Sequence, residues 1–141
     1  MREAVYTQRM QADPDTIWAF VSDLRNDPLW RREVKNSELI SGEPRSVGAS
    51  YRETIGWEGV DVTLILTVTE SVRGSRVVIT GEDASYSSTG VWTFEPQADH
   101  TLVSLKVSME TKGATHLVEP FMWSLVTRWF ERDLPQLERH L

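Results

Sequence analysis

The sequence predicts an α+β domain in which one antiparallel sheet is covered by helices on a single side. Three observations lead to this fold class. The chain has a helical period near its start, a strand-like period of two through its middle, and a helical period again at its end. With 141 residues the chain is long enough to bury a hydrophobic core, and we expect one domain over residues 1–141.

The first predicted elements are a strand and two short helical segments. Residues 3–11 have strand character. A helix should follow, because Asp13 is a good N-cap and Pro14 suits the first helical position. Pro28 interrupts any continuation of this helix, so residues 23–31 are expected to form a second short helix or a turn.

Six further strands are predicted after the short helices. The clearest is residues 60–69, where aliphatic residues alternate with polar ones. This alternation predicts that Leu64 and Leu66 are buried and that Thr63 and Thr67 face solvent. One dry face and one wet face indicate an antiparallel sheet that is covered on a single side. The six candidate strands are residues 33–40, 48–55, 60–70, 75–82, 86–95 and 101–111.

A long C-terminal helix is predicted from about residue 115 to the end of the chain. Apolar residues recur there at helical spacing, in a stripe that begins at Met122. Pro120 fits near the start of this helix, whereas Pro135 should kink or loosen it.

The composition argues against several classes of function. The formal net charge of -6 argues against nucleic-acid binding, which requires a basic face. The absence of cysteine removes disulfides, thiolate catalysis and thiolate metal sites. No apolar run approaches the ~20 residues of a membrane span, so no integral membrane segment is expected. The N-terminus lacks the apolar stretch of a signal peptide, so we expect a cytoplasmic location.

The sequence contains no recognisable catalytic, cofactor or metal motif. The histidines His100, His116 and His140 do not have the spacing of metal ligands, and no metal site is expected. No serine lies in a G-x-S-x-G motif, and the 8 glycines are scattered at turns rather than gathered in a phosphate-binding loop. We therefore expect no cofactor, and no catalytic residue can be assigned.

Several stretches of the chain carry a family resemblance. The segment ADPDTIWAFVSDLRNDPLW resembles the opening pattern of the polyketide cyclase/dehydrase-like branch of the START-related (SRPBCC, pollen-allergen-like) helix-grip superfamily. In that pattern a small residue, a proline, an aliphatic residue and two tryptophans correspond here to Ala12, Pro14, Ile17, Trp18 and Trp30. SVGASYRETI resembles the second glycine-led strand of the family, GVWTFEPQADHTLVSLKVSME its last hairpin, and DLPQLERHL its tail. The resemblance covers essentially the whole chain.

The resemblance implies a helix-grip fold. In this fold a curved seven-stranded antiparallel sheet wraps around a long C-terminal helix, with two short helices between strands 1 and 2. A cavity lies between the sheet and the helix, and the connector that carries Trp30 would lie near its closed side or rim. Trp30 would either border this cavity or plug the core beneath the short helices.

The candidate cavity residues are aromatic, polar and apolar side chains expected on inward faces. Hydroxyl groups and a carboxylate in this set could polarise a ligand carbonyl, fix the orientation of a bound molecule, or fill the core. The candidates are Trp30, Tyr51, Glu53, Leu64, Leu66, Tyr86, Ser88, Trp92, Val107, Met122, Trp123 and Val126.

Three functions are compatible with these expectations. The first is binding of a small hydrophobic or amphipathic ligand in the cavity between the sheet and the C-terminal helix. The second is a polyketide cyclase/dehydrase-type enzyme that acts on a ligand in the same cavity, and the third is a protein-interaction module with a closed cavity. The expected partner is a small hydrophobic molecule rather than a nucleic acid, and the protein is expected to be a monomer or a homodimer.

Overall fold

The computed structural model describes residues 1–141, which form seven strands, three α-helices and three 3₁₀ helices. The strands are β1 (Arg2–Met10), β2 (Val34–Ser41), β3 (Ser50–Trp57), β4 (Val60–Val72), β5 (Arg76–Glu82), β6 (Tyr86–Pro96) and β7 (Thr101–Thr111). The α-helices are α1 (Pro14–Val21), α2 (Asp27–Trp30) and α3 (Glu119–Asp133). The 3₁₀ helices are η1 (Leu24–Asn26), η2 (Gly113–Val118) and η3 (Leu134–His140).

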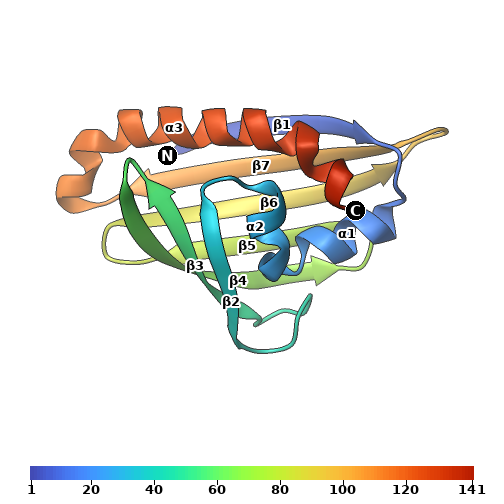
Figure 1. Cartoon of the computed structure of the whole chain (residues 1–141), viewed down its shortest axis with the longest axis horizontal. Coiled ribbons are helices and arrows are strands. Elements are labelled where there is room, and N and C mark those ends of the chain that lie inside the picture. Colours follow the sequence, from blue (N-terminus) through green and yellow to red (C-terminus); the bar gives the residue numbers. More distant parts are fainter.

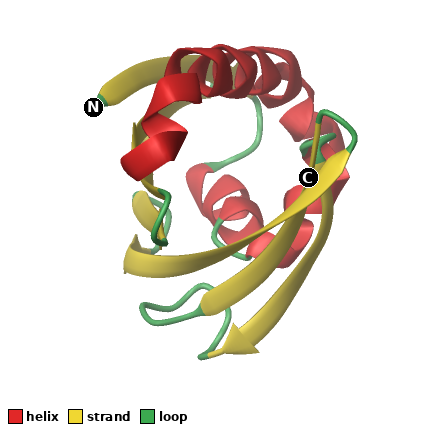
Figure 2. Cartoon of the chain, turned by 90° about the vertical axis from the view of Figure 1, so that its left-hand side faces the viewer, coloured by secondary structure: helices red, strands yellow, loops and turns green.

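The seven strands form one antiparallel sheet in the order β1-β7-β6-β5-β4-β3-β2. Every neighbouring pair is consecutive in the chain except β1 and β7, which pair from Arg2 opposite Met109 to Met10 opposite Thr101. The strands curve around one side of the molecule while the long helix α3 lies across the other (Figures 1 and 2). This architecture confirms the α+β class, the helix-grip fold and the two short helices between strands 1 and 2.

Capping and proline residues in the sequence determine where the two short helices begin. The Asp13 side chain accepts a hydrogen bond from the Thr16 backbone N–H at 2.8 Å, so Asp13 caps α1 as predicted. Pro28 lies in the first turn of α2, where a missing N–H removes no helical hydrogen bond. Ile17 of α1 and Trp30 of α2 are buried in the hydrophobic core together with residues of the sheet. Both short helices are therefore packed onto the inner face of the sheet.

The predicted long C-terminal helix is present with narrower bounds than expected. Helix α3 covers residues 119–133, and the residues on either side form the 3₁₀ helices η2 and η3. Gly113 begins η2 at a φ of 60°, a backbone conformation that favours glycine. Pro135 lies in the first turn of η3 and has no N–H with which to continue the α-helical hydrogen bonds, so it favours the end of α3 at this point. None of the helices has the length and apolar content needed to cross a membrane.

The hydrophobic core lies between the inner face of the sheet and the segments α1, α2 and η3. Its fully buried members include Ile17 of α1, Val77 of β5, Val103 of β7 and Leu137 of η3. Opposite α3, however, part of the apolar inner face borders an open cavity instead of packed side chains.

The alternation predicted for β4 is present, with two differences in burial. Thr63 is exposed as predicted, but Leu64 and Leu66 are half-buried rather than buried, because they border the cavity. Thr67 is half-buried rather than exposed, and its hydroxyl oxygen lies 2.8 Å from the Ser50 hydroxyl oxygen of β3. The polar face of β4 is therefore partly engaged in hydrogen bonding with its neighbour strand.

Candidate functional site

A cavity of about 660 Å³ separates helix α3 from the inner face of the sheet. Its walls come from β3 to β7, from the short helices and from α3, and most of the lining residues are hydrophobic. A mostly apolar pocket of this size is typical of binding sites for small molecules. The cavity is therefore the candidate functional site.

Most of the cavity residues predicted from the sequence lie in this lining. They are Trp30, Leu64, Leu66, Tyr86, Ser88, Trp92, Val107, Met122 and Val126. Tyr51, Glu53 and Trp123 do not line the cavity. Trp123 follows Met122 on α3, so its side chain leaves the helix about 100° further round, and it packs against the hydrophobic core.

Trp30 contributes both to the core and to the cavity wall. Its side chain is only 4% exposed and meets Trp92 of β6 edge to face, with the ring centroids 5.8 Å apart. The ring centroid of Phe130 on α3 lies 6.4 Å from that of Trp30. The large indole thus joins the connector, the sheet and α3, which explains why a tryptophan occupies this short helix.

A second aromatic contact joins the β3–β4 hairpin to α3. The rings of Trp57 and Trp129 meet edge to face, with their centroids 5.3 Å apart. Val60 lines the cavity from the start of β4 and is 63% exposed, and Phe121 lines it from the start of α3 and is 56% exposed. The cavity therefore opens to solvent between this hairpin and the first turn of α3.

Three charged residues meet where α2 faces β3, and we call them the Asp27–Arg31–Glu53 cluster. The Arg31 Nη1 atom lies 3.6 Å from Asp27 Oδ2 and 3.7 Å from Glu53 Oε1. Asp27 and Arg31 line the cavity, whereas the Glu53 side chain is fully buried outside the lining. The Arg31 guanidinium also lies over the Phe130 ring, 4.9 Å from its centroid.

The cluster holds a carboxyl group with a perturbed pKa. Burial, followed by the charge of Glu53 and a hydrogen bond between the two side chains, raises the pKa of Asp27 well above its ordinary value, and Arg31 offsets this only in part. Asp27 therefore keeps its proton under conditions in which an exposed aspartate is ionised. Apart from the proton that Asp27 can offer, neither carboxylate oxygen of Glu53 has a hydrogen-bond donor in the protein. The polar atoms of the cluster are incompletely paired, which is unusual for buried groups.

Three neutral hydroxyl side chains, those of Tyr86, Ser88 and Thr89, line the cavity from β6. Burial, with smaller contributions from the charges of Asp83 and Glu53, raises the pKa of Tyr86 to about 12. The Tyr86 hydroxyl is therefore protonated at neutral pH. Because a hydroxyl both donates and accepts hydrogen bonds, these side chains can orient a bound molecule without adding charge.

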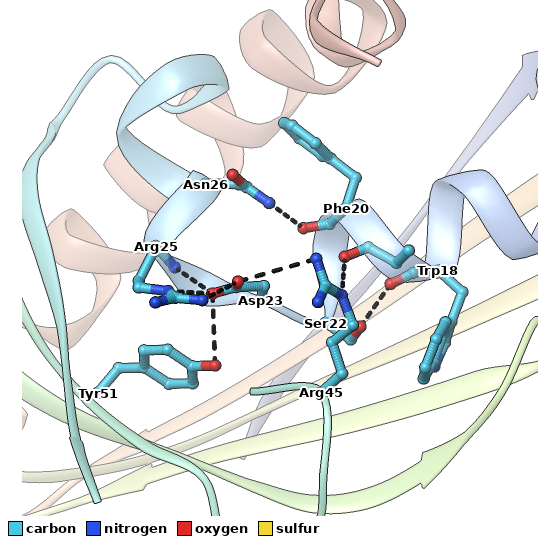
Figure 3. Close-up of polar contacts among 9 residues, drawn as sticks. Trp18, Phe20, Ser22, Asp23, Arg25, Asn26, Arg45 and Tyr51 are labelled. Carbon is cyan, nitrogen blue, oxygen red and sulfur yellow. Dashed lines mark hydrogen bonds and ion pairs between the residues drawn. The ribbon is translucent and has the colours of Figure 1, made fainter. Parts of the chain in front are cut away.

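Tyr51, in contrast, belongs to a separate polar cluster between β3 and η1. Its hydroxyl donates to Asp23 Oδ1 at 3.5 Å, and Arg25 donates to the same carboxylate through Nε at 3.0 Å and Nη2 at 2.7 Å (Figure 3). Burial acts to raise the pKa of Asp23, but the hydrogen bonds and charge of Arg25 and the charge of Arg45 outweigh it, so the pKa is lowered. This cluster connects the sheet to the short helices, away from the cavity.

Comparison with known proteins identifies the family. The chain matches the family described as polyketide cyclase / dehydrase and lipid transport over residues 1–141. The chain belongs to this family. No curated protein sequence is similar enough to the chain to match it.

Solved structures of low sequence identity show the same fold. TTHA0849 from Thermus thermophilus is 17% identical, with a TM-score of 0.75 over 98% of this chain and 92% of that chain. A START superfamily protein from Mycobacterium smegmatis is 17% identical, with a TM-score of 0.71 over 96% of this chain and 98% of that chain. The Zhui aromatase/cyclase from a Streptomyces species is 13% identical, with a TM-score of 0.75 over 98% of this chain and 89% of that chain.

Several cavity residues of this family member were not predicted from its sequence. Trp129 could have been found, because it lies seven residues after Met122 and so shares its face of α3. Asp27 and Arg31 lie four residues apart, a spacing that ordinary surface ion pairs on helices also have. Only the folded structure, in which the Arg31 side chain reaches β3, shows that Glu53 joins them.

Proposed function

We propose that the chain binds a small hydrophobic or amphipathic molecule in the cavity between the sheet and α3. The observation that carries this proposal is the volume of about 660 Å³ together with the mostly apolar lining. Membership of a family whose description includes lipid transport supports the same function. The opening beside the β3–β4 hairpin provides a route for a ligand to enter.

Gly90 offers a direct way to fill the cavity. It lines the cavity from β6, and a Cβ added there would meet only Leu105 Cδ1, at 3.8 Å. The side chain of a Gly90→Phe variant should therefore occupy ligand space without a backbone clash. Val91 is the next residue and points to the opposite face of the strand, so Val91→Phe is the matched control.

Ligand binding can be measured with Nile red, an uncharged dye whose emission rises in apolar surroundings. We expect the unmodified protein and Val91→Phe to bind the dye with similar affinity, and Gly90→Phe to bind it about tenfold or more weakly. Fatty acids, alcohols and sterols then serve as competitors. Equal dye binding by all three proteins, with circular dichroism showing intact folds, would contradict the proposal.

Intrinsic tryptophan emission gives an independent measurement. Trp92 lines the cavity and Trp123 does not, so a bound ligand should change the emission of Trp92 but not that of Trp123. Trp92→Phe should therefore reduce the ligand-induced change in emission, and Trp123→Phe should preserve it. The reverse result would show that ligands bind elsewhere.

A cyclase- or dehydrase-type enzyme is the second candidate, and one observation favours it. Asp27 lines the cavity and has a raised pKa, which are properties of a general acid. Turnover of a polyketide-like substrate, lost in Asp27→Asn, would establish this activity. The third candidate, an interaction module, requires a cavity closed by side chains, and the open cavity does not favour it.

The proposal also includes a cytoplasmic location, a monomer or homodimer, and no nucleic-acid partner. Cell fractionation tests the location, and light scattering after size-exclusion chromatography tests the oligomeric state. A nucleic-acid partner would appear in the purified sample as excess ultraviolet absorbance on the short-wavelength side of the tryptophan and tyrosine band.

A further inference from the structure

We infer that the Asp27–Arg31–Glu53 cluster binds the polar end of the cavity's ligand and selects an uncharged hydroxyl group over a carboxylate. This inference rests on the proposed function, because it names the chemical class of the ligand in the same cavity. Three properties of the cluster support it, namely its position, its unpaired hydrogen-bonding atoms and its charge.

The cluster is the buried charged part of the cavity. Asp27 is 6% exposed, the Arg31 side chain is 17% exposed, and the Glu53 side chain is 0% exposed. The other charged residues of the lining, Glu58 and Asp83, are exposed and lie in connections between strands. The charged groups of the cavity that are shielded from water are therefore those of the cluster. An amphipathic ligand that enters beside the β3–β4 hairpin would meet them there.

The hydrogen-bonding capacity of the cluster is largely unused. The Arg31 contacts with Asp27 and Glu53, at 3.6 and 3.7 Å, exceed the about 2.7–3.2 Å of an N–H···O hydrogen bond. The only hydrogen bond that Arg31 donates comes from its backbone N–H, to the Asp27 carbonyl oxygen. The Glu53 oxygens also lack a full set of donors. A ligand hydroxyl can accept a hydrogen bond from the Arg31 guanidinium and donate one to the Asp27 carboxyl group, the two members of the cluster that line the cavity.

The charge of the cluster disfavours an anionic ligand. When Asp27 is protonated, it is neutral, and the negative charge of Glu53 balances the positive charge of Arg31. A ligand carboxylate beside Arg31 would add a second negative charge next to the first, in a buried site where water screens repulsion poorly. A neutral hydroxyl avoids this repulsion.

Substitution of both carboxyl groups should therefore invert the selectivity. The double variant Asp27→Asn/Glu53→Gln keeps the side-chain sizes but leaves Arg31 as an unpaired cation at the cavity wall. Such a guanidinium binds a carboxylate through two parallel hydrogen bonds. Arg31→Met, in contrast, keeps the length of the side chain and removes its charge and donors, so it should weaken hydroxyl binding without creating a site for carboxylates.

The test compares decanol with decanoate as competitors of Nile red. We expect the unmodified protein to bind decanol about tenfold or more tightly than decanoate, because like charges in an interface are strongly unfavourable. The double variant should bind decanoate more tightly than decanol. Arg31→Met should lose more affinity for decanol than for Nile red, because the dye has no hydroxyl group and the alcohol does.

The possible outcomes separate this inference from the proposed function. Equal binding of decanol and decanoate by the unmodified protein, or an unchanged preference in the double variant, would overturn the inference and leave ligand binding in the cavity intact. If neither compound competes and Gly90→Phe binds Nile red normally, both proposals fail. If the double variant does not fold, Arg31→Met decides, since an unchanged affinity for decanol would also overturn the inference.

Discussion

Truncation of Leu66 should cost little stability, because this side chain borders a cavity that is already open. Leu66 lies on β4, is half-buried and lines the cavity. Leu137 on η3 is 0% exposed and lies in the packed core. Leu66→Ala therefore removes apolar contacts without creating a closed void, whereas Leu137→Ala creates one.

The difference in environment sets the expected magnitudes. A change from leucine to alanine removes three carbon atoms, worth about 2 kcal/mol when the side chain is fully buried. For the half-buried Leu66 we expect about 1 kcal/mol, since roughly half of that burial is lost. For Leu137 the void adds to the transfer term, and we expect about 3–5 kcal/mol.

Urea denaturation measures both losses as shifts of the midpoint at constant m-value. A constant m-value serves as the control, because a change would mean that the native or denatured state had itself been altered. If Leu66→Ala costs as much as Leu137→Ala, then Leu66 is tightly packed and the cavity does not extend to β4.

Three further predictions concern charge and backbone. As pH rises, Asp27→Asn should become more stable relative to the unmodified protein. The reason is that protonated Asp27 contributes stability that is complete below its ordinary pKa of 3.8 and is lost as pH rises through its higher native pKa. Parallel curves of unfolding free energy against pH, measured by urea denaturation, would contradict this. Glu119→Gln should behave in the opposite way, because the Thr111 hydroxyl and backbone N–H and the charge of His116 lower the pKa of Glu119 from 4.5 to about 2. The variant should be less stable at neutral pH, and this difference in urea denaturation should vanish as pH falls from 4.5 towards 2. Gly90→Ala should raise the free energy of unfolding by about 0.5–1 kcal/mol. Gly81→Ala should not raise it, because the added Cβ would lie 2.7 Å from Leu66 Cδ2. Equal effects of the two variants would show that the space around each glycine does not determine the change in stability.

The elements could be predicted because their signals are local. The cap at Asp13 depends on residues within one helical turn, and the faces of β4 depend on an alternation that any strand imposes on its side chains. The end of α3 was anticipated less well. Pro135 predicts that the α-helix is interrupted near this position, but a proline alone does not distinguish a kinked helix from a change to 3₁₀ geometry.

The cavity was harder to predict because it depends on packing between distant segments. Met122 and Trp123 are neighbours of similar character, and only the orientation of α3 over the sheet determines which of them faces the cavity. The sequence predicts Glu53 as a cavity residue, but its partners are Asp27 at the start of α2 and Arg31 at the C-cap of that helix, and β2 lies between them and Glu53 in the chain. No spacing rule within one element connects such residues.

The pairing of β1 with β7 determines when this fold can be completed during synthesis. Arg2 lies opposite Met109 in the register of β1 and β7, so β1 has no partner strand until β7 has been made. Contacts between such distant segments slow folding, typically to milliseconds or seconds in β-rich domains. During synthesis β1 therefore stays unpaired longer than any other strand of the sheet. Its unpaired edge and the face that carries Tyr6 and Met10 are available during that time to chaperones and to other nascent chains.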